Sequence, residues 1–290
     1  MPCNCSHLYL CLVAILLSIS TTTQAQSFEL GVQVGTANYL GDLTPSNLWV
    51  SLGETNLSTG LIGRFHASRW ISIQAGIRHG TISATDANAL ETQGRRRRNL
   101  HFRTAITEIA LISEFHLLGY RAAMDNWRLS PYAFIGIAWY HFNPKAKLGD
   151  TWYELQPLGT EGQGLPGRPD KYRLNQWSVP LGLGLRYALN RRWTISLEWG
   201  MRKTYTDYLD DTSSVYPDLE ALAELRGEIA AQLSWRTREL NPEALPPSPG
   251  AERGDADDLD WYIFSGITIS RSIQAPQQKK NRGRVKCPGF

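Results

Sequence analysis

The stretch Leu174–Tyr205 reads LNQWSVPLGLGLRYALNRRWTISLEWGMRKTY, and its alternation decides the fold class. Large apolar residues hold every second position of two runs joined at Asn190-Arg191: Trp177, Val179, Leu181, Leu183, Leu185, Tyr187 and Leu189, then Trp193, Ile195, Leu197, Trp199 and Met201. A period of two indicates β-strands with one apolar face and one small or polar face. Each run covers roughly ten residues, the length that a tilted strand needs to cross the hydrocarbon core of a bilayer.

The two faces of this hairpin distinguish a membrane barrel from a soluble β-sandwich, which also alternates. Aromatic side chains occupy the ends of the apolar face, where the girdles of a membrane barrel lie: Trp177, Tyr187, Trp193, Trp199 and Tyr205. The opposite face carries Arg186, Glu198 and Arg202 among glycines, unlike the interior of a soluble sandwich. Pro180 removes a backbone donor, so we expect a bulge or a strand end at this position.

The same strand signal recurs along the whole chain. It covers eight stretches: Phe28–Gly35, Leu57–His66, Trp70–Ile82, Phe102–Leu117, Leu129–Phe142, Leu174–Leu189, Trp193–Tyr205 and Asp260–Ile273. The connections after the first, third, fifth and seventh stretches are long, and the other three are short. This pattern is typical of outer-membrane barrels, whose strand number is even and whose long loops lie at one end. We therefore predict an all-β fold: an eight-stranded antiparallel transmembrane β-barrel with long extracellular loops.

The two ends of the chain lie outside the predicted barrel, which spans residues 26–275. Residues 1–25 read as a signal peptide, with a short apolar core at Leu8–Ile19 and small residues at a cleavage site. Residues 276–290 form a basic tail, and parity places both termini of the mature chain in the periplasm of a Gram-negative cell. After cleavage Cys287 is the single cysteine, and Lys286 and Arg284 beside it favour its thiolate. We predict that these three residues bind a partner; the alternative is an unused thiol at a frayed end.

Charged residues at inward positions form the second set of candidates. By strand parity this set comprises Arg64, Arg78, Glu108, Glu114, Arg186, Glu198 and Arg202. Side chains can fill the interior of an eight-stranded barrel, and buried charges need partners of opposite sign. We interpret these residues as ion pairs that hold the barrel shut, and the alternative is a polar path for a solute.

The long connections hold the remaining candidates. Arg95, Arg96, Arg97 and Arg98 form an unbroken run in the predicted second loop, where they could contact lipopolysaccharide phosphates or simply lie in solvent. Asp207, Asp210 and Asp211 could bind calcium but lack an EF-hand pattern, so they more plausibly form a hydrogen-bonded loop base. Pro217–Trp235 has the periodicity of one amphipathic helix, which would pack on the loops or dock a partner.

Composition and motifs argue against several functions. The net charge of +3 is too small to suggest a nucleic-acid partner. No G-x-S-x-G, H-E-x-x-H or paired-cysteine motif is present. We therefore predict no enzyme activity, no cofactor and no metal. The weak enzymatic alternative is a lipid hydrolase or acyltransferase on the barrel rim, with His79, His101 or His141 near a serine such as Ser83.

Several loop segments resemble a known family. These segments are Asn38-Tyr39-Leu40-Gly41-Asp42-Leu43, residues 94–103, His141-Phe142-Asn143-Pro144-Lys145-Ala146, residues 152–163, residues 203–211 and the closing Asp260-Trp261-Tyr262. Their order and spacing resemble the outer-membrane barrel component of the type IX secretion system, the PorG-like family. The likeness covers nearly all of the mature chain; the arginine run and the Pro-rich Asn241–Gly254 segment are particular to this sequence.

The resemblance implies a function that periodicity alone does not. It implies a non-catalytic integral outer-membrane protein, surrounded by outer-membrane lipid, that anchors or associates with the periplasmic ring subunits of a machine exporting folded cargo with a C-terminal signal. The alternative is a loop-mediated adhesin or lipid-binding outer-membrane barrel.

Overall fold

A computed structural model describes residues 27–44, 53–88, 93–120, 128–190 and 192–273 of the 290-residue chain. The predicted signal peptide lies outside the described residues. The predicted partner-binding residues Arg284, Lys286 and Cys287 lie outside them as well.

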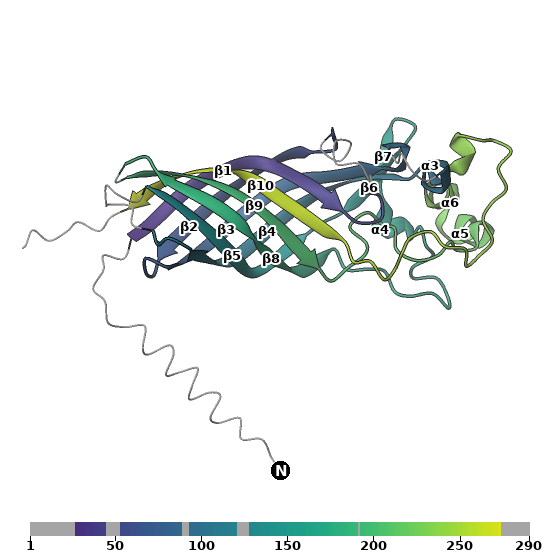
Figure 1. The fold of residues 1–290 in the computed structure, drawn as a ribbon. Coiled ribbons are helices and arrows are strands. Elements are labelled where there is room, and N and C mark those ends of the chain that lie inside the picture. The colour runs from purple at the N-terminus through teal and green to yellow at the C-terminus, as the bar shows by residue number, and fades with distance from the viewer. Residues whose placement is uncertain (1–26, 45–52, 89–92, 121–127, 191, 274–290) are drawn as a thin grey trace, which may run out of the picture.

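Within the described residues, eight long strands close into an antiparallel barrel, which confirms the predicted fold class (Figure 1). The strands are β1 (Ser27–Leu40), β2 (Asn56–His66), β3 (Ile71–Thr85), β4 (His101–His116), β5 (Leu129–His141), β8 (Asn175–Ala188), β9 (Trp193–Thr204) and β10 (Trp261–Ile273). Each pairs with its neighbours along the chain, and β1 pairs with β10 to close the ring, with Phe28 opposite Ile273. Closure leaves no strand edge of the ring unpaired, as a bilayer requires.

The outer wall of the barrel carries an apolar belt. On β8 and β9, for example, Leu183 and Leu197 are 61% and 54% exposed, whereas the intervening Arg186 and Ser196 are fully buried. Exposed aromatic residues lie near both ends of the strands: Phe28, Trp70, Phe115, Tyr187 and Trp193 at one end, Trp139, Trp177 and Tyr205 at the other. A soluble barrel would bury such a surface, so the belt identifies this barrel as a transmembrane one.

The connections divide the barrel into two unlike ends. We call the end where β1 begins and β10 ends the turn end, because β2, β4 and β8 also end there and the strands that follow them begin there, after the short connections (Figure 1). We call the opposite end the loop end; β1, β3, β5 and β9 end there, each before a long connection. The predicted alternation of short and long connections is therefore present.

The loop end contains more regular structure than the sequence patterns predict. The punctuated segment after β5 forms a hairpin, β6 (Pro144–Leu148) and β7 (Thr151–Glu154), which extends the sheet beside β4, and a helical turn, α4 (Leu155–Leu158). The arginine run was expected to be a loop but forms a short helix, α3 (Gln93–Arg98). No helix in the described part of the chain is both long and apolar enough to cross a membrane.

Two further expectations about the elements are wrong. The single helix predicted over Pro217–Trp235 is two helices, α5 (Leu219–Arg226) and α6 (Glu228–Ser234). Between them Gly227 adopts a positive φ of 92°, which interrupts the helix. Pro180 causes neither a bulge nor a strand end: β8 continues through it, and its register with β9 and β5 is the same on both sides. The pairing with β5 is interrupted opposite Gly136 and Ile137, which is consistent with the missing proline donor.

Candidate functional site: the lumen network and the loop cap

All seven charged residues that strand parity assigned to the interior lie inside the barrel. Each of them is at most 4% exposed, and each takes part in ion pairs. They come from five strands: β2 supplies Arg64, β3 supplies Arg78, β4 supplies Glu108 and Glu114, β8 supplies Arg186, and β9 supplies Glu198 and Arg202. We call this set, together with the polar residues that contact it, the lumen network.

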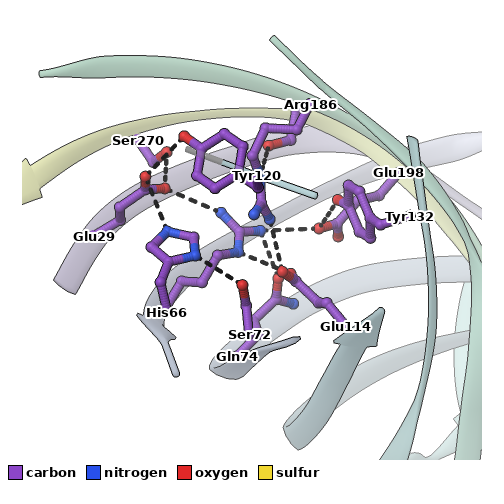
Figure 2. A network of polar contacts seen from close by, with 12 residues as sticks. Glu29, His66, Ser72, Gln74, Glu114, Tyr120, Tyr132, Arg186, Glu198 and Ser270 are labelled. Atoms are coloured by element: carbon purple, nitrogen blue, oxygen red, sulfur yellow. Dashed lines mark hydrogen bonds and ion pairs between the residues drawn. The ribbon is translucent and has the colours of Figure 1, made fainter. Parts of the chain in front are cut away.

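Arg64 lies at the centre of the network. Its guanidinium is 2.8 Å from Glu114, 3.2 Å from Glu198 and 3.6 Å from Glu29, and it donates to the side-chain amide oxygen of Gln74 at 2.7 Å. Figure 2 shows these groups converging on one point from separate strands. One buried cation thus joins three carboxylates across the barrel.

The half of the network nearer the loop end is organised around Glu108. This carboxylate is 3.0 Å from Arg202 and 3.3 Å from Arg78, and it accepts a hydrogen bond from the Tyr262 hydroxyl at 2.9 Å. Arg78 also reaches Glu198 at 3.3 Å. Glu198 therefore links the two halves of the network.

Glu29 is the lumen charge that sequence reasoning missed. The seven predicted residues comprise four arginines and three glutamates, so they leave one positive charge without a counterpart. Glu29 supplies it: the side chain is 1% exposed and lies near Arg64. Its position between the outward-facing Phe28 and Leu30 was the signal that could have identified it. With Glu29, the network holds four arginines and four glutamates.

A hydrogen-bonded chain closes the network at the turn end. His66 lies 3.1 Å from Glu29 and 2.7 Å from the Ser72 hydroxyl (Figure 2). That hydroxyl is 2.9 Å from His116. Tyr120, which follows β4, inserts its ring here and donates to Glu29 at 3.1 Å. The chain combines a carboxylate, an imidazole and a hydroxyl, but Ser72 is completely buried and so is not exposed to a substrate.

Arg186 is clamped between two aromatic rings. Its guanidinium lies 4.8 Å from the ring centres of both Tyr120 and Tyr132, and it is 2.7 Å from Glu114. The Tyr132 hydroxyl in turn donates to Glu198 at 2.8 Å. Since Tyr120 comes from a connecting segment instead of a strand, parity could not assign it to the lumen. Together these rings and ion pairs fill the interior, as expected when only eight strands enclose it.

The loops form a second polar structure, which we call the loop cap, over the loop end of the barrel. Glu161 is its main acceptor: the carboxylate accepts from the backbone N–H groups of Ser213 and Ser214 and lies 2.9 Å from Arg253. Tyr172 stacks on Tyr208 with ring centres 4.7 Å apart. Segments distant in sequence are therefore held in one arrangement above the barrel.

The four arginines of α3 divide between the loop cap and the surface. Arg98 forms a two-pronged pair with buried Asp86 at 2.8 and 2.9 Å, and it also donates to the Arg253 carbonyl. Arg95 lies 3.7 Å from Asp86 and donates to the Thr44 carbonyl. Arg96 and Arg97 are exposed. Arg95 and Arg98 are thus part of the loop cap, and contact of this run with lipopolysaccharide stays a prediction.

Aspartates gather under the loop cap, as the predicted hydrogen-bonded loop base requires. The Tyr39 hydroxyl lies 2.8 Å from Asp210 and 2.6 Å from Asp260, and Asp211 accepts from Tyr172 and Thr160. Burial raises the pKa of Asp211 to about 6, although Arg253 opposes the shift. Burial also raises the pKa of Asp207 to about 9, and the nearby Asp42 and Asp210 carboxylates add to this rise. In the described part of the chain, no group of three or more His, Cys, Asp or Glu side chains is arranged to hold a metal ion.

Comparison with known proteins identifies a family. The family model described as "Domain of unknown function (DUF6089)" matches residues 6–235. No curated protein matches the sequence.

Solved structures of outer-membrane proteins are similar to this chain in fold. Neisserial surface protein A has 7% identity and a TM-score of 0.41, with 86% of this chain and 100% of that chain covered. The attachment invasion locus protein Ail of Yersinia pestis, in complex with the heparin analogue sucrose octasulfate, has 7% identity and a TM-score of 0.40 with the same coverage. The outer membrane protein OprG of Pseudomonas aeruginosa has 9% identity and a TM-score of 0.39, with 86% and 98% covered. At these identities the likeness concerns the fold alone.

Proposed function

We propose a non-catalytic role for this chain, which belongs to the DUF6089 family. In this proposal it is an integral outer-membrane component of the type IX secretion system that anchors or associates with the periplasmic ring. The observation that carries the proposal is the filled lumen. Four arginines and four glutamates pair inside the barrel, and Tyr120 blocks its turn end. A barrel whose interior is occupied in this way serves through its surfaces, not through a channel.

The proposal includes an orientation. Short turns of outer-membrane barrels lie on the periplasmic side and long loops on the extracellular side. On this basis the turn end faces the periplasm, and the basic tail over residues 276–290 follows β10 on that side. The tail and the short turns are then the parts of the chain within reach of periplasmic ring subunits. The link to type IX secretion itself rests on the resemblance of the loop segments.

A deletion strain tests the secretion role. Loss of the gene should abolish or strongly reduce export of cargo with a C-terminal signal, and the full-length chain should restore it. Periplasmic ring proteins should also co-purify with the tagged chain from detergent extracts. Normal cargo export in the deletion strain, together with a bare barrel after purification, would overturn the role.

A truncation tests whether the basic tail or the short turns contact the ring. A chain lacking residues 276–290 should insert normally but co-purify less ring protein, and Cys287→Ser should remove any higher-mass species seen on non-reducing gels. If the truncated chain still captures the ring in full, the short turns, not the tail, provide the contact.

A loop-mediated adhesin or lipid-binding barrel is the second candidate. It is favoured by apolar side chains that remain exposed at the loop end: Leu225 and Leu240 are each 60% exposed and Leu245 is 87% exposed. This candidate predicts normal cargo export in the deletion strain and a loss of surface or lipid binding when the three leucines are replaced by serine.

A further inference from the structure

The lipid-facing wall changes character near the loop ends of β3, β4, β5 and β8. His79 lies opposite Thr107, Thr107 opposite His141, and His141 opposite Asn175, so the four residues form one row across four strands. Their side chains point outward and join in pairs: His79 Nδ1 is 2.9 Å from the Thr107 hydroxyl, and His141 Nδ1 is 2.9 Å from Asn175 Oδ1. Because an amide oxygen only accepts, His141 donates through Nδ1.

This polar row lies directly on the loop-end side of the aromatic girdle. Trp139 and Trp177 are paired across β5 and β8, and each lies two positions nearer the turn end than His141 and Asn175. Tryptophan marks the boundary between hydrocarbon and headgroups. The row therefore lies at headgroup level. The same row continues through Thr59 on β2, Val34 on β1 and Ile267 on β10, none of which has a titratable group.

Two exposed arginines stand beyond the row on the same wall. Arg103 lies four residues beyond Thr107 on β4, and Arg173 lies two residues beyond Asn175 before β8. Neither side chain makes a hydrogen bond or ion pair with the residues that the structure describes. Arg103 is on β4, and Arg173 directly precedes β8, which pairs with β5, the neighbour of β4. Lys145, opposite Arg103 on β6, adds a cation that Glu154 neutralises at 2.9 Å.

We propose that this surface, formed by His79, His141, Arg103 and Arg173, binds phosphate groups of lipopolysaccharide in the outer leaflet. The proposal rests on the orientation given above but not on the secretion role. Arginine pairs with phosphate through two parallel hydrogen bonds, and such charge-assisted bonds are stronger where water is scarce. The surface continues the lipid-facing belt without a break, so the molecule that covers it is a lipid with an anionic headgroup.

This surface is distinct from the arginine run of α3. Arg95 and Arg98 pair with Asp86 inside the loop cap, whereas Arg103 and Arg173 are exposed at the loop end of the outer wall. Arg103 belongs to β4 and not to the loop cap, because β3–β4 pairing continues to its level, with Ser83 opposite it.

Lipid binding by purified, lipid-free protein in detergent tests the proposal. The probes are lipopolysaccharide and the same lipopolysaccharide after chemical removal of its phosphates, titrated against wild type and the Arg103→Gln/Arg173→Gln variant. Each lost charge-assisted bond should weaken binding about tenfold. Wild type should bind the dephosphorylated lipid as weakly as the variant binds the intact lipid. A Lys203→Gln/Arg271→Gln variant, which removes two outward cations elsewhere, should bind like wild type.

Several outcomes would overturn the proposal. Equal binding of both lipids by wild type would do so without any variant, so a folding defect in the variant cannot hide the answer. Equal loss in the Lys203→Gln/Arg271→Gln control would show that binding depends on net charge and not on this surface. Unchanged binding by a correctly folded Arg103→Gln/Arg173→Gln variant would assign the phosphate to another part of the wall. The lipid titration does not depend on cargo export, so failure of the proposed secretion role would leave its result unchanged.

Discussion

The loss of barrel stability caused by replacing one lumen residue depends on how many opposite charges that residue compensates. Arg64 approaches three carboxylates and is completely buried. Moving a charge out of water costs several kcal/mol, and the attraction of its partners offsets that cost only while all partners are present. The lumen network is therefore weak evidence for high stability but strong evidence for sensitivity to the loss of one member.

Replacing Arg64 by methionine should destabilise the barrel by roughly 3–5 kcal/mol, because buried carboxylates lose their shared cation. Urea unfolding in lipid vesicles measures this change. Arg271→Gln, which removes an exposed arginine near Trp193 from the outer wall, should change the free energy of unfolding by less than about 1 kcal/mol. Similar losses in the two variants would contradict the central place of Arg64.

The sequence predicts whether a side chain lies inside the barrel only within the strands, where parity applies, and not in the connections. Parity placed seven charges inside the barrel, and charge balance would have added Glu29. Tyr120 could not be predicted, because it belongs to a connection whose return into the barrel has no periodic signal. The pairing of Arg98 with Asp86 was also out of reach, since it depends on how two ends of one loop meet.

At the scale of an element, β8 shows how closely a strand separates lipid from lumen. Leu183 is 61% exposed on the outer wall, while the next residue, Gly184, faces Tyr132 so closely that a Cβ atom would lie 2.2 Å from its ring. Position 183 therefore requires a side chain that is stable in lipid, whereas position 184 has no room for a side chain. The alternation of large apolar and small residues in the sequence matches these two requirements.

Leu183→Arg should destabilise the barrel by about 2–4 kcal/mol, because a charge would enter the hydrocarbon near the midplane. Gly184→Leu should destabilise it by a different mechanism: the new side chain would displace Tyr132, whose hydroxyl donates to Glu198. Unfolding in bilayers of two thicknesses separates the causes, because only the Leu183→Arg cost should depend on hydrocarbon thickness. Tolerance of arginine at Leu183 equal to that at the inward Ser178 would refute the strand register.

The loop-cap elements were the least predictable from sequence. Leu219, Leu222, Leu225, Ile229 and Leu233 suggested one apolar face on one helix. Gly227 instead breaks the segment, so that Leu222 and Leu233 are buried while Leu225 is exposed. The hairpin of β6 and β7 is stabilised by packing against α6, through Ala146, Tyr153 and Leu233. Such contacts between segments distant in sequence produce no periodic pattern in the sequence of either segment, so the sequence does not predict them.

The segment after β9 should respond to pH through Asp207. Its pKa is raised to about 9 from the usual 3.8, so the folded loop cap holds this proton more tightly than the unfolded segment does. The resulting stabilisation is complete below about pH 4 and is lost as pH rises through about 9. Hydrogen exchange of residues 207–218, corrected for intrinsic rates, should therefore show weakening protection between pH 7 and 9.5.

Asp207→Asn is the matched control for this pH effect, because its amide stays neutral. Asp210 and Asp260 are present in both proteins, so a difference in slope between wild type and variant reports the carboxyl group at position 207 and its coupling to these neighbours. A protection profile with the same slope in both proteins would contradict the assignment.

At the scale of the whole molecule, the barrel is closed by two independent structures. The lumen network fills the membrane-spanning part and ends at Tyr120, and the loop cap covers the opposite end with buried pairs such as Glu161 with Arg253. Opening a path would require breaking ion pairs in the first and hydrogen bonds in the second. Function is therefore best sought on the outer wall, the loops and the turn end.

This closure predicts that the intact protein does not conduct ions. Eight strands leave room only for side chains, and here four arginines and four glutamates occupy that room in mutual contact. An ion entering the lumen would have to displace a charge that its neighbours hold at 2.7–3.6 Å. Planar-bilayer recordings of the purified protein at neutral pH should show no stable conductance steps, while a porin inserted into the same bilayer supplies the positive control. Large, stable steps from the wild-type protein would mean that the lumen network rearranges in the membrane, and the anchoring role would then lose the observation on which it rests.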